Sequence, residues 1–457
     1  MPVLMTRPRR PRPVAILALA VLVAAATQVS SASHGAAPPT TLDVPPVEIT
    51  TGDVPAVGAG DLDRIRANIA FWSERSDAYP RDFVSHTRRA AAEVDLARVT
   101  GDVTRYEAAA AALDEALAAN PEYGPALGYR GAVLVALHEF DAARSHARAV
   151  LANRPGDLAA LAVLGDASLA LGDMDAARGA YEQLALVANT AATRVRRSHL
   201  AFVDGDPAGA VEASRAAVDA AIDEGLEGAA LAWFRSQLGD TLASTGDLDG
   251  AADAFAAALR DDPGSALARW GLARVAAAAE RWDEAIAHLD RAIATIPSPE
   301  FLARRADLYR LRGADGDGRR ERDDRRTVLA IAGLRSAAAG VYDRTLSLYL
   351  ASNGEDPARA LELAESELTA RRDIYGYDAL AWALLANDRA EEARVAMTEA
   401  LALGTRDSKL LYHAGMIEAR LGHAAAARTF LEDALRTDPS FDPVAVRAAR
   451  ATLAGLS

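Results

Sequence analysis

The stretch of sequence that decides the fold is residues 238–263, LGDTLASTGDLDGAADAFAAALRDDP. Two segments with helical patterning flank the pair Gly246-Asp247, and Pro263 closes the stretch. Glycine favours the left-handed C-cap of the first helix, aspartate caps the start of the second, and proline prevents the second from continuing. The stretch therefore predicts a helix-turn-helix hairpin.

Small and large residues of the second helix recur along the chain at matching places. Ala251 is followed by Phe255 four residues later and by Ala258 after three more, so the three share one helical face. The residue equivalent to Ala251 recurs at Ala109, Ala143, Ala177, Ala210, Ala285, Ala360, Ala393 and Ala427. Most steps are 33, 34 or 41 residues, and the single step of 75 residues fits two units, one of them degenerate.

The period of these residues sets the architecture. Prolines also recur 34 residues apart, as Pro121 with Pro155 and as Pro263 with Pro297. A hairpin of this length cannot bury its apolar stripe alone and must stack on its neighbours. We therefore expect an all-α solenoid whose stability comes from many similar interfaces.

At these positions the chain resembles the tetratricopeptide repeat, whose pattern is W-x2-L-G-x2-Y, then A-x3-F, then P. The best copy carries Leu238, Gly239, Leu242, Ala251, Phe255 and Pro263. Copies at residues 131–155, 165–184 and 415–439 are similar. The resemblance covers roughly residues 90–440 in about ten units, and it implies an α-α superhelical solenoid of helix-turn-helix repeats.

Two units depart from the pattern. The unit near residues 194–217 has Pro207 in its turn, and the unit near residues 301–334 lacks the diagnostic small residues.

The first 32 residues are predicted to be a signal peptide. Four arginines within residues 7–12 precede the apolar stretch 14–26, and small residues follow near Ala32, where we expect cleavage. Thirteen apolar residues are fewer than the roughly 18 to 20 that span a bilayer. The alternative is an uncleaved membrane anchor.

The rest of the chain divides into three parts. Residues 33–60 are rich in proline and are interpreted as an extended linker, either a spacer from a membrane or a segment with no role. Residues 61–441 are expected to be the repeat array, beginning with a capping helix that carries Trp72. Residues 442–457 are expected to form a C-terminal capping helix, and pairing with a second molecule is the alternative.

Charge and composition limit the class of partner. The chain has 50 basic and 64 acidic residues, and without the signal arginines 46 basic residues remain. This acidic excess argues against nucleic acid as a partner. The absence of cysteine excludes disulfides, thiol chemistry and a lipoprotein anchor. Lys409 is the only lysine, so the chain cannot form the lysine and asparagine clamp with which co-chaperones of this family hold a peptide carboxylate.

The candidate site is the inner wall of the array, which the first helix of each hairpin mostly forms. Projecting the repeats onto that helix places ten candidate partner-binding residues there: His199, Phe202, Trp270, Arg274, Arg304, Tyr349, Asp378, Trp382, Tyr412 and Arg420. Aromatic rings offer large contact areas, and arginine offers directional donors for carboxylates or peptide carbonyls. The alternative is that Trp270 and Trp382 fill space between helices, as most large core residues do.

Motifs for chemistry are weak. Residues 313–318 resemble the start of a calcium loop, but Arg319, Arg320 and Arg326 occupy positions of a ligand, the glycine and the closing glutamate, so we predict a turn. The histidines do not have metal-ligand spacing, and no motif for a nucleophile or a nucleotide occurs. We therefore predict no catalytic, cofactor-binding or metal site, no cofactor, and no enzyme activity.

The sequence thus favours an exported, extracytoplasmic scaffold or adaptor that binds a protein or peptide in its concave groove. Two alternatives stay open. One is a cell-envelope module that stacks sugar rings on Trp270, Tyr349, Trp382 and Tyr412. The other is an accessory scaffold subunit of an envelope complex. Contact with a membrane is expected only through the signal segment, if that segment is not cleaved.

Overall fold

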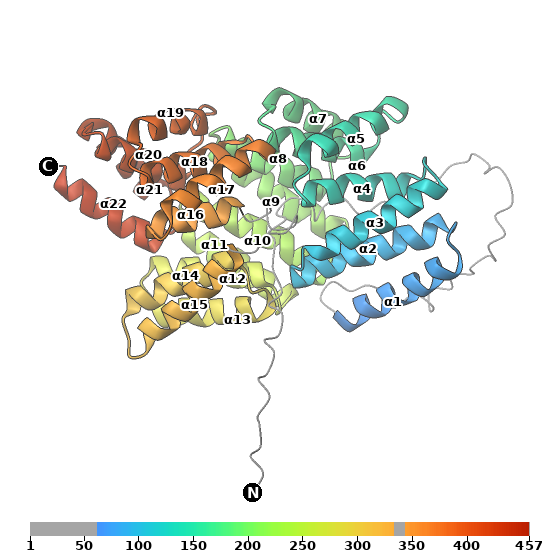
Figure 1. The fold of residues 1–457 in the computed structure, drawn as a ribbon, viewed down its shortest axis with the longest axis horizontal. Coiled ribbons are helices and arrows are strands. Elements are labelled where there is room, and N and C mark those ends of the chain that lie inside the picture. Colours follow the sequence, from blue (N-terminus) through green and yellow to red (C-terminus); the bar gives the residue numbers. More distant parts are fainter. Residues whose placement is uncertain (1–61, 333–342, 457) are drawn as a thin grey trace, which may run out of the picture.

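A computed structural model describes residues 62–332 and 343–456. Within these two ranges the chain forms 22 α-helices and no β-strand (Figure 1), which confirms the predicted all-α solenoid. None of the described helices has the length and the hydropathy needed to cross a bilayer. The predicted signal peptide, residues 1–32, and the predicted linker, residues 33–60, lie outside the described residues.

The helices form ten hairpins between a leading helix, α1 (Leu62–Ala78), and a final helix, α22 (Pro443–Gly455). The hairpins are α2 (Phe83–Thr100) with α3 (Thr104–Ala119), α4 (Gly124–Ala136) with α5 (Phe140–Asn153), α6 (Leu158–Ala170) with α7 (Met174–Val187), α8 (Ala191–Val203) with α9 (Pro207–Asp223), α10 (Gly228–Ser244) with α11 (Leu248–Asp261), α12 (Ala266–Ala278) with α13 (Trp282–Thr295), α14 (Pro299–Arg312) with α15 (Asp317–Ala332), α16 (Asp343–Asn353) with α17 (Pro357–Ala370), α18 (Ile374–Ala386) with α19 (Ala390–Ala400), and α20 (Ser408–Arg420) with α21 (Ala424–Thr437). The hairpin α14–α15 is the degenerate unit that the 75-residue step predicted.

The recurring alanine lies where the two helices of a hairpin touch. Ala251 and its eight equivalents are all 0% exposed. Phe255, on the same face, is also 0% exposed, and its ring fills the space beside Gly239 of α10 and Gly271 of α12. A methyl group on Gly239 would lie 2.6 Å from that ring. Small residues on the first helices therefore make room for the large residue of the second helix, as the repeat pattern requires.

The turns inside the hairpins have the predicted capping geometry. Gly172 and Gly246 are left-handed, with φ of 76° and 90°. The next residue caps the second helix in each case, because Asp173 accepts a hydrogen bond from the Ala176 amide at 3.2 Å and Asp247 does the same for Gly250 at 2.9 Å.

The sequence that resembles a calcium loop forms a turn held by arginine. Gly313 ends α14 in a left-handed conformation, and Asp317 begins α15. The buried carboxylate of Asp317 accepts hydrogen bonds from the Arg312 guanidinium at 2.6 and 2.9 Å and from the Ala314 amide at 2.9 Å. The carboxylate of Asp317 therefore accepts its hydrogen bonds from arginine and from the backbone.

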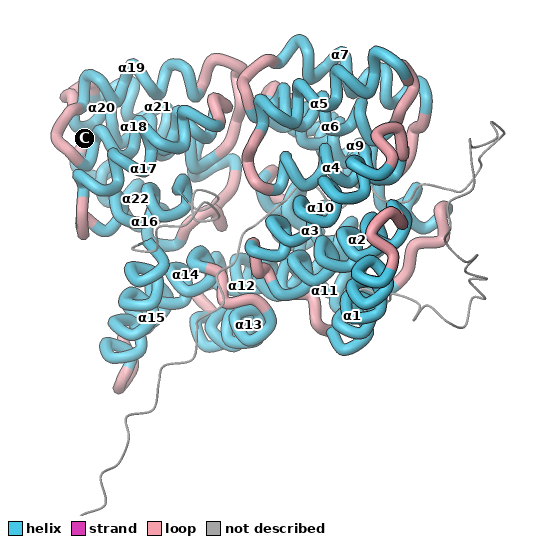
Figure 2. Tube along the Cα trace, turned by 45° about the vertical axis from the view of Figure 1, so that its right-hand side comes forward, coloured by secondary structure: helices cyan, strands magenta, loops and turns pink. Residues whose placement is uncertain are grey.

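The array turns far enough for its last hairpins to meet hairpins of its first half. In Figures 1 and 2 the helices α17 to α21 lie beside α4 to α9, although they are far apart in sequence. The Arg372 amide donates to the Ala170 carbonyl at 2.8 Å, and Arg371 lies 2.8 Å from the ring nitrogen of His138. The concave groove that the sequence predicts is therefore narrowed by the chain itself.

Loops make most of the contact between the last hairpins and the earlier ones. We call this interface the seam. It joins the turns at Gly172, Gly205 and Gly246 to the loops at Arg372, Gly404 and Thr437. A methyl group would lie 2.6 Å from the Arg372 carbonyl if added to Gly172 and 2.8 Å from the Thr437 carbonyl if added to Gly246. Extensive packing between described helices is confined to helices one or two places apart in the chain, so the seam is a thinner interface than the stacking within the array.

Candidate functional site

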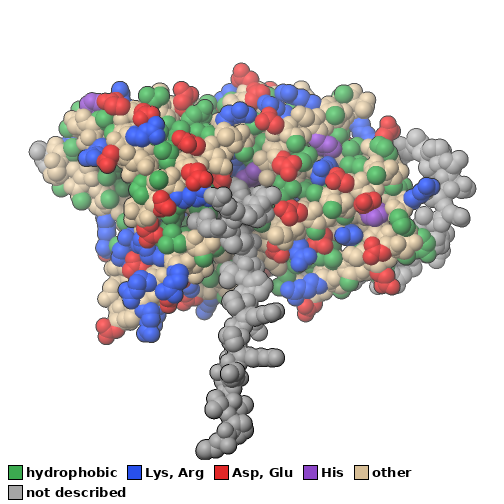
Figure 3. Space-filling model, in the orientation of Figure 1, with side chains coloured by type: hydrophobic (Ala, Val, Ile, Leu, Met, Phe, Trp, Pro, Cys, Tyr) green, Lys and Arg blue, Asp and Glu red, His purple; other side chains and the backbone are tan. Residues whose placement is uncertain are grey.

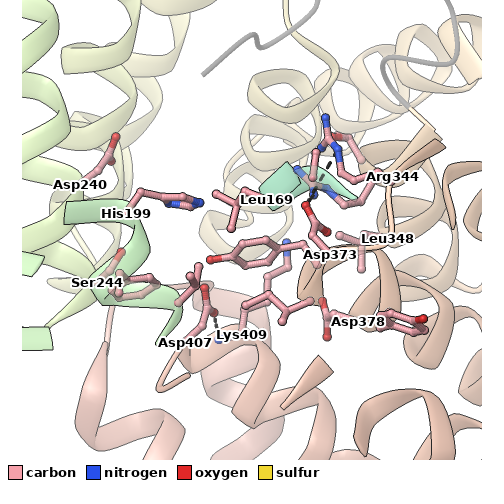
Figure 4. Close-up of a pocket in the computed structure, with 18 of the residues that line it drawn as sticks. Leu169, His199, Asp240, Ser244, Arg344, Leu348, Asp373, Asp378, Asp407 and Lys409 are labelled. Carbon is pink, nitrogen blue, oxygen red and sulfur yellow. Dashed lines mark hydrogen bonds and ion pairs between the residues drawn. The ribbon is translucent and has the colours of Figure 1, made fainter. Parts of the chain in front are cut away.

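The inner wall of the array lines a partly open cavity of about 850 Å³. The first helices of most hairpins line it: α4, α6, α8, α10, α14, α16, α18 and α20. Figure 4 shows His199 and Asp240 entering from one side and Arg344, Asp373 and Asp378 from another, with Lys409 and Asp407 between them. The seam loops complete the lining through Arg371, Arg372 and Asp442. The cavity is therefore a product of the superhelical turn and belongs to no single hairpin.

Five of the ten candidate residues line this cavity, namely His199, Phe202, Arg304, Tyr349 and Asp378. The other five, Trp270, Arg274, Trp382, Tyr412 and Arg420, lie outside its lining. The assignment of all ten residues to partner binding stays a prediction. The structure shows which residues each candidate contacts.

The aromatic candidates pack mostly against other rings. Trp270 stacks on Phe301 with ring centroids 5.1 Å apart, and Trp382 stacks on His413 at 4.0 Å. Tyr412 is 6% exposed and lies beside Trp382. The indole nitrogen of Trp382 also donates to the Ser352 hydroxyl at 2.9 Å. These contacts correspond to the packing alternative that the sequence left open for the two tryptophans.

The arginine candidates already have partners within the chain. Arg274 lies 3.1 Å from Asp240 and 3.3 Å from Asp438, which is 164 residues further along the chain. Arg304 lies 2.7 Å from Asp442. Arg274 and Arg304 therefore join the inner wall to the loop before α22.

Two further candidates that line the cavity are His199 and Asp378. The pKa of His199 is lowered, chiefly because burial disfavours the imidazolium. Asp378 is 1% exposed, and its carboxylate lies 2.7 Å from Nδ1 of His413. Asp378 thus orients a neighbouring ring, whereas His199 projects into the cavity (Figure 4).

Sequence reasoning missed several charged residues of the cavity. Glu300 and Asp307 lie one turn on either side of Arg304 in α14, so helical spacing from Arg304 could have found them. Asp240 follows the glycine of its repeat pattern and faces the same cavity. Lys409 is exposed and lies at the start of α20. The first positions of a helix are not among the recurring positions of the repeat pattern, so the pattern could not identify this residue.

Burial shapes the chemistry of the cavity carboxyls. The pKa of Asp240 is raised to about 6, chiefly by burial; Arg274 acts to lower it, and the nearby carboxylates of Glu300 and Asp438 act to raise it. Burial also raises the pKa of Asp307 to about 6, against the lowering effect of Arg304. In the part of the chain that the structure describes, no group of three or more metal-ligating side chains gathers here or elsewhere. The cavity wall therefore presents hydrogen-bonding and charged groups.

The described residues on the face shown in Figure 3 form no stripe of a single charge. On the face shown in Figure 3, basic and acidic side chains are interspersed. Where arginines are dense, in the helix α15, they pair with acidic neighbours such as Glu321 with Arg325 at 3.3 Å. Mixed charge of this kind is typical of a solvated helical surface.

Models of the tetratricopeptide repeat match residues 130–194, 236–300 and 408–441. These matches fall on the hairpins whose sequence pattern was clearest, so the matched parts of the chain are tetratricopeptide repeats. The search of curated proteins found no significant match.

Solved structures of similar proteins are repeat solenoids of low sequence identity. A thermophilic tetratricopeptide-repeat protein of Thermus thermophilus is 23% identical over 38% of this chain and 91% of its own, with a TM-score of 0.34. The human IFIT1 dimer with PPP-AAAA is 13% identical over 82% of this chain and 87% of its own, with a TM-score of 0.45. Yeast Tom70 is 15% identical over 86% of this chain and 93% of its own, with a TM-score of 0.33.

Proposed function

We propose that this protein is an exported, non-catalytic scaffold that binds a protein or peptide partner in its inner cavity. A tetratricopeptide scaffold suggests protein–protein interaction in general. The observation that carries the more specific proposal is the cavity of about 850 Å³ lined by the first helices of most hairpins. A volume in the range of about 300 to 1,000 Å³ suits a ligand that is largely enclosed, such as a few residues of an extended segment.

The lining suits a peptide better than a sugar. The lining combines apolar side chains such as Phe202 and Leu348 with groups such as Gln237 and Asn353, whose amides can bond to peptide amides and carbonyls. Stacking of sugar rings needs exposed aromatic faces, but Tyr349 and Tyr412 are 8% and 6% exposed. Trp382 has one face against His413. These positions support the peptide proposal over the glycan alternative.

A cavity-filling variant tests the site. Ser244 lies on the cavity wall (Figure 4), so Ser244→Trp should occupy the space that a bound segment needs. We expect binding of peptides selected on the wild-type chain to fall by at least about tenfold, because the side chain excludes them sterically. Calorimetric titration measures the loss.

The matched control places the same side chain outside the cavity. Thr429 is exposed on α21, and Thr429→Trp should keep the wild-type affinity. Both variants should keep the helical circular dichroism of the wild type. If Ser244→Trp binds as tightly as Thr429→Trp, the partner does not use the cavity.

Export is tested on the intact chain in a bacterial host. The arginines, apolar stretch and small residues of the first 32 positions support cleavage near Ala32. We expect the mature chain outside the cytoplasm, with its first residue near His34 by amino-terminal sequencing. An uncleaved chain in the membrane fraction would support the anchor alternative, and an uncleaved chain in the cytoplasm would contradict export.

A further inference from the structure

One side-chain contact beside the seam joins residues that lie 233 positions apart in the chain. His138 is in the turn between α4 and α5, and Arg371 follows the last residue of α17. Nη2 of Arg371 lies 2.8 Å from Nε2 of His138, and both residues line the cavity. The contact therefore helps to close the cavity where the last hairpins meet the earlier ones.

The chemistry of the two groups sets the protonation state of His138 in this contact. A guanidinium only donates hydrogen bonds, so Nε2 of His138 must accept and carries no proton. The imidazole is therefore neutral, with its proton on Nδ1. An imidazolium in the same place would turn one donor toward another and bring two positive charges together.

Phe140 holds both groups at this distance. The His138 ring stacks on the Phe140 ring with centroids 5.2 Å apart, and the Arg371 guanidinium lies over the same ring, 5.1 Å from its centroid. Phe140 itself is 4% exposed. Neither group can therefore move away from the other without losing its contact with Phe140.

The carboxylates on the far side of the contact pair with arginines. Glu367 of α17 lies 3.5 Å from Arg371, and Asp373 lies 4.0 Å from Arg371 and 3.7 Å from Arg344 of α16. Burial raises the pKa of Glu367, so acid removes its negative charge earlier than that of an ordinary glutamate. These groups would therefore not compensate a second positive charge on His138 in acid.

The near side of the contact offers no carboxylate to His138 either. Asp141 of α5 pairs with Arg144 at 2.7 Å and with Arg372 at 3.4 Å, and Glu139 is exposed. Among the described residues, no carboxylate forms an ion pair with His138. Burial, together with the positive charges of Arg371 and Arg344, lowers the pKa of His138 well below its usual value.

We propose that His138 is a pH sensor of the seam, and that its protonation separates it from Arg371 and opens the seam at Arg372. Few other contacts hold the loop there. The Arg372 amide donates to the Ala170 carbonyl at 2.8 Å, and the Arg372 side chain lies 3.4 Å from Asp141. The inference goes beyond the proposed function, because it concerns how the chain closes over its own cavity and requires no bound partner.

The direction of the effect and its pH window follow from linkage. In the open seam the His138 ring is free of Arg371 and takes up a proton near the ordinary pKa of about 6.5. The closed seam disfavours that proton. The closed state therefore has its full stability above about pH 6.5, and the ratio of closed to open molecules falls below that pH by up to about tenfold per unit.

The Arg372 amide reports on the opening directly, because its hydrogen bond to Ala170 crosses the seam. Hydrogen exchange of the intact chain, divided at each pH by the intrinsic rate of an unstructured peptide, gives the protection of this amide. We expect protection in the wild type to be constant from about pH 8 to about pH 7 and to fall about tenfold between about pH 6.5 and about pH 5.

Three variants assign this response to the contact. His138→Gln supplies an oxygen that accepts from Arg371 at every pH, so its protection should not fall in acid. Arg371→Gln removes the like charge, and its amide oxygen can accept from an imidazolium, so its response should be weak. His423→Gln changes an exposed histidine outside the cavity lining and should respond as the wild type does.

Two results would overturn the sensor. One is wild-type protection that stays constant between about pH 6.5 and about pH 5, and the other is an equal fall in His138→Gln. Circular dichroism at each pH separates local opening from unfolding, and a loss of helical signal in step with the protection would also contradict the proposal. Because no peptide is present, the result is independent of whether the cavity binds a partner.

Discussion

At the scale of single residues, the inner wall depends on buried charges that partners within the chain neutralise. The clearest case is Arg196 with Asp166, which are 3% and 4% exposed and joined by two hydrogen bonds of 2.8 Å. The Tyr181 hydroxyl also donates to Asp166 at 2.8 Å. A pair of this kind holds its geometry firmly, because removing one member would leave the other charge buried without compensation.

Asp240 is less well compensated, and this should make stability depend on pH. Its pKa is raised from 3.8 to about 6 in the folded state, so between these values the native state binds more protons than the unfolded state. The contribution of Asp240 to folding is therefore most favourable at pH below about 4 and declines as the pH rises to about 6.

The variant Asp240→Asn removes this titration. We expect the unfolding midpoint of the wild type to fall relative to that of the variant as the pH is raised from about 4 to about 6, and the difference to be constant above that window. Urea unfolding at a series of pH values measures this difference. Glu212→Gln, at an exposed site, should run parallel to the wild type, and parallel curves for Asp240→Asn would show that Asp240 does not titrate abnormally.

At the scale of elements, every hairpin turn reverses the chain, and some of the turns also form the seam. The sequence alone does not distinguish these two roles. The turn residue is left-handed in every hairpin, including His138, Glu280 and Asp388, where it is not glycine. The conformation alone therefore does not require glycine. Gly172, Gly205 and Gly246 meet a backbone carbonyl across the seam, whereas Gly354 and Gly422 have open space beside them.

This contrast supplies a matched pair of variants. Gly422→Ala should cost only the left-handed conformation, about 1 to 2 kcal/mol. Gly205→Ala carries the same conformational cost, with φ of 76° against 81°, and its methyl group would also strike the Gly404 carbonyl. We expect Gly205→Ala to open the seam locally, with faster amide exchange around Gly404 and a larger radius of gyration in X-ray scattering.

Both variants should keep nearly all of the wild-type helical signal, because the stacking of hairpins does not pass through the seam. Equal exchange rates around Gly404 in the two variants would mean that the close approach of these loops does not stabilise the seam in solution.

At the scale of the whole molecule, the hairpins were predictable and the closure was not. The positions of Ala251 and its equivalents, the capping turns and the number of units follow from patterns within about 40 residues, which a single sequence displays directly. The ion pair of Arg274 with Asp438 joins residues 164 apart. Such a contact depends on the rotation accumulated over many hairpins, and a repeat length does not fix that rotation.

The same reason explains the mixed outcome for the candidate site. Helical projection identified Arg304 and His199, which line the cavity, because the face of a first helix is a local property. It also selected Trp270 and Arg420, which do not line it, because a projection treats every hairpin as part of one open wall. Helical projection could not identify Asp442, because that residue enters the cavity from the loop before α22.

The position of Lys409 has a practical consequence for anyone who attaches this protein to a surface or a dye. It is the only lysine in the chain, it is exposed, and it lines the space that we assign to the partner. Reagents that couple to primary amines would therefore react there or at the amino terminus, and coupling at Lys409 would obstruct that space. Immobilisation through a carboxy-terminal tag leaves it free, and a single fluorophore on Lys409 would in turn report directly on whether the space is filled.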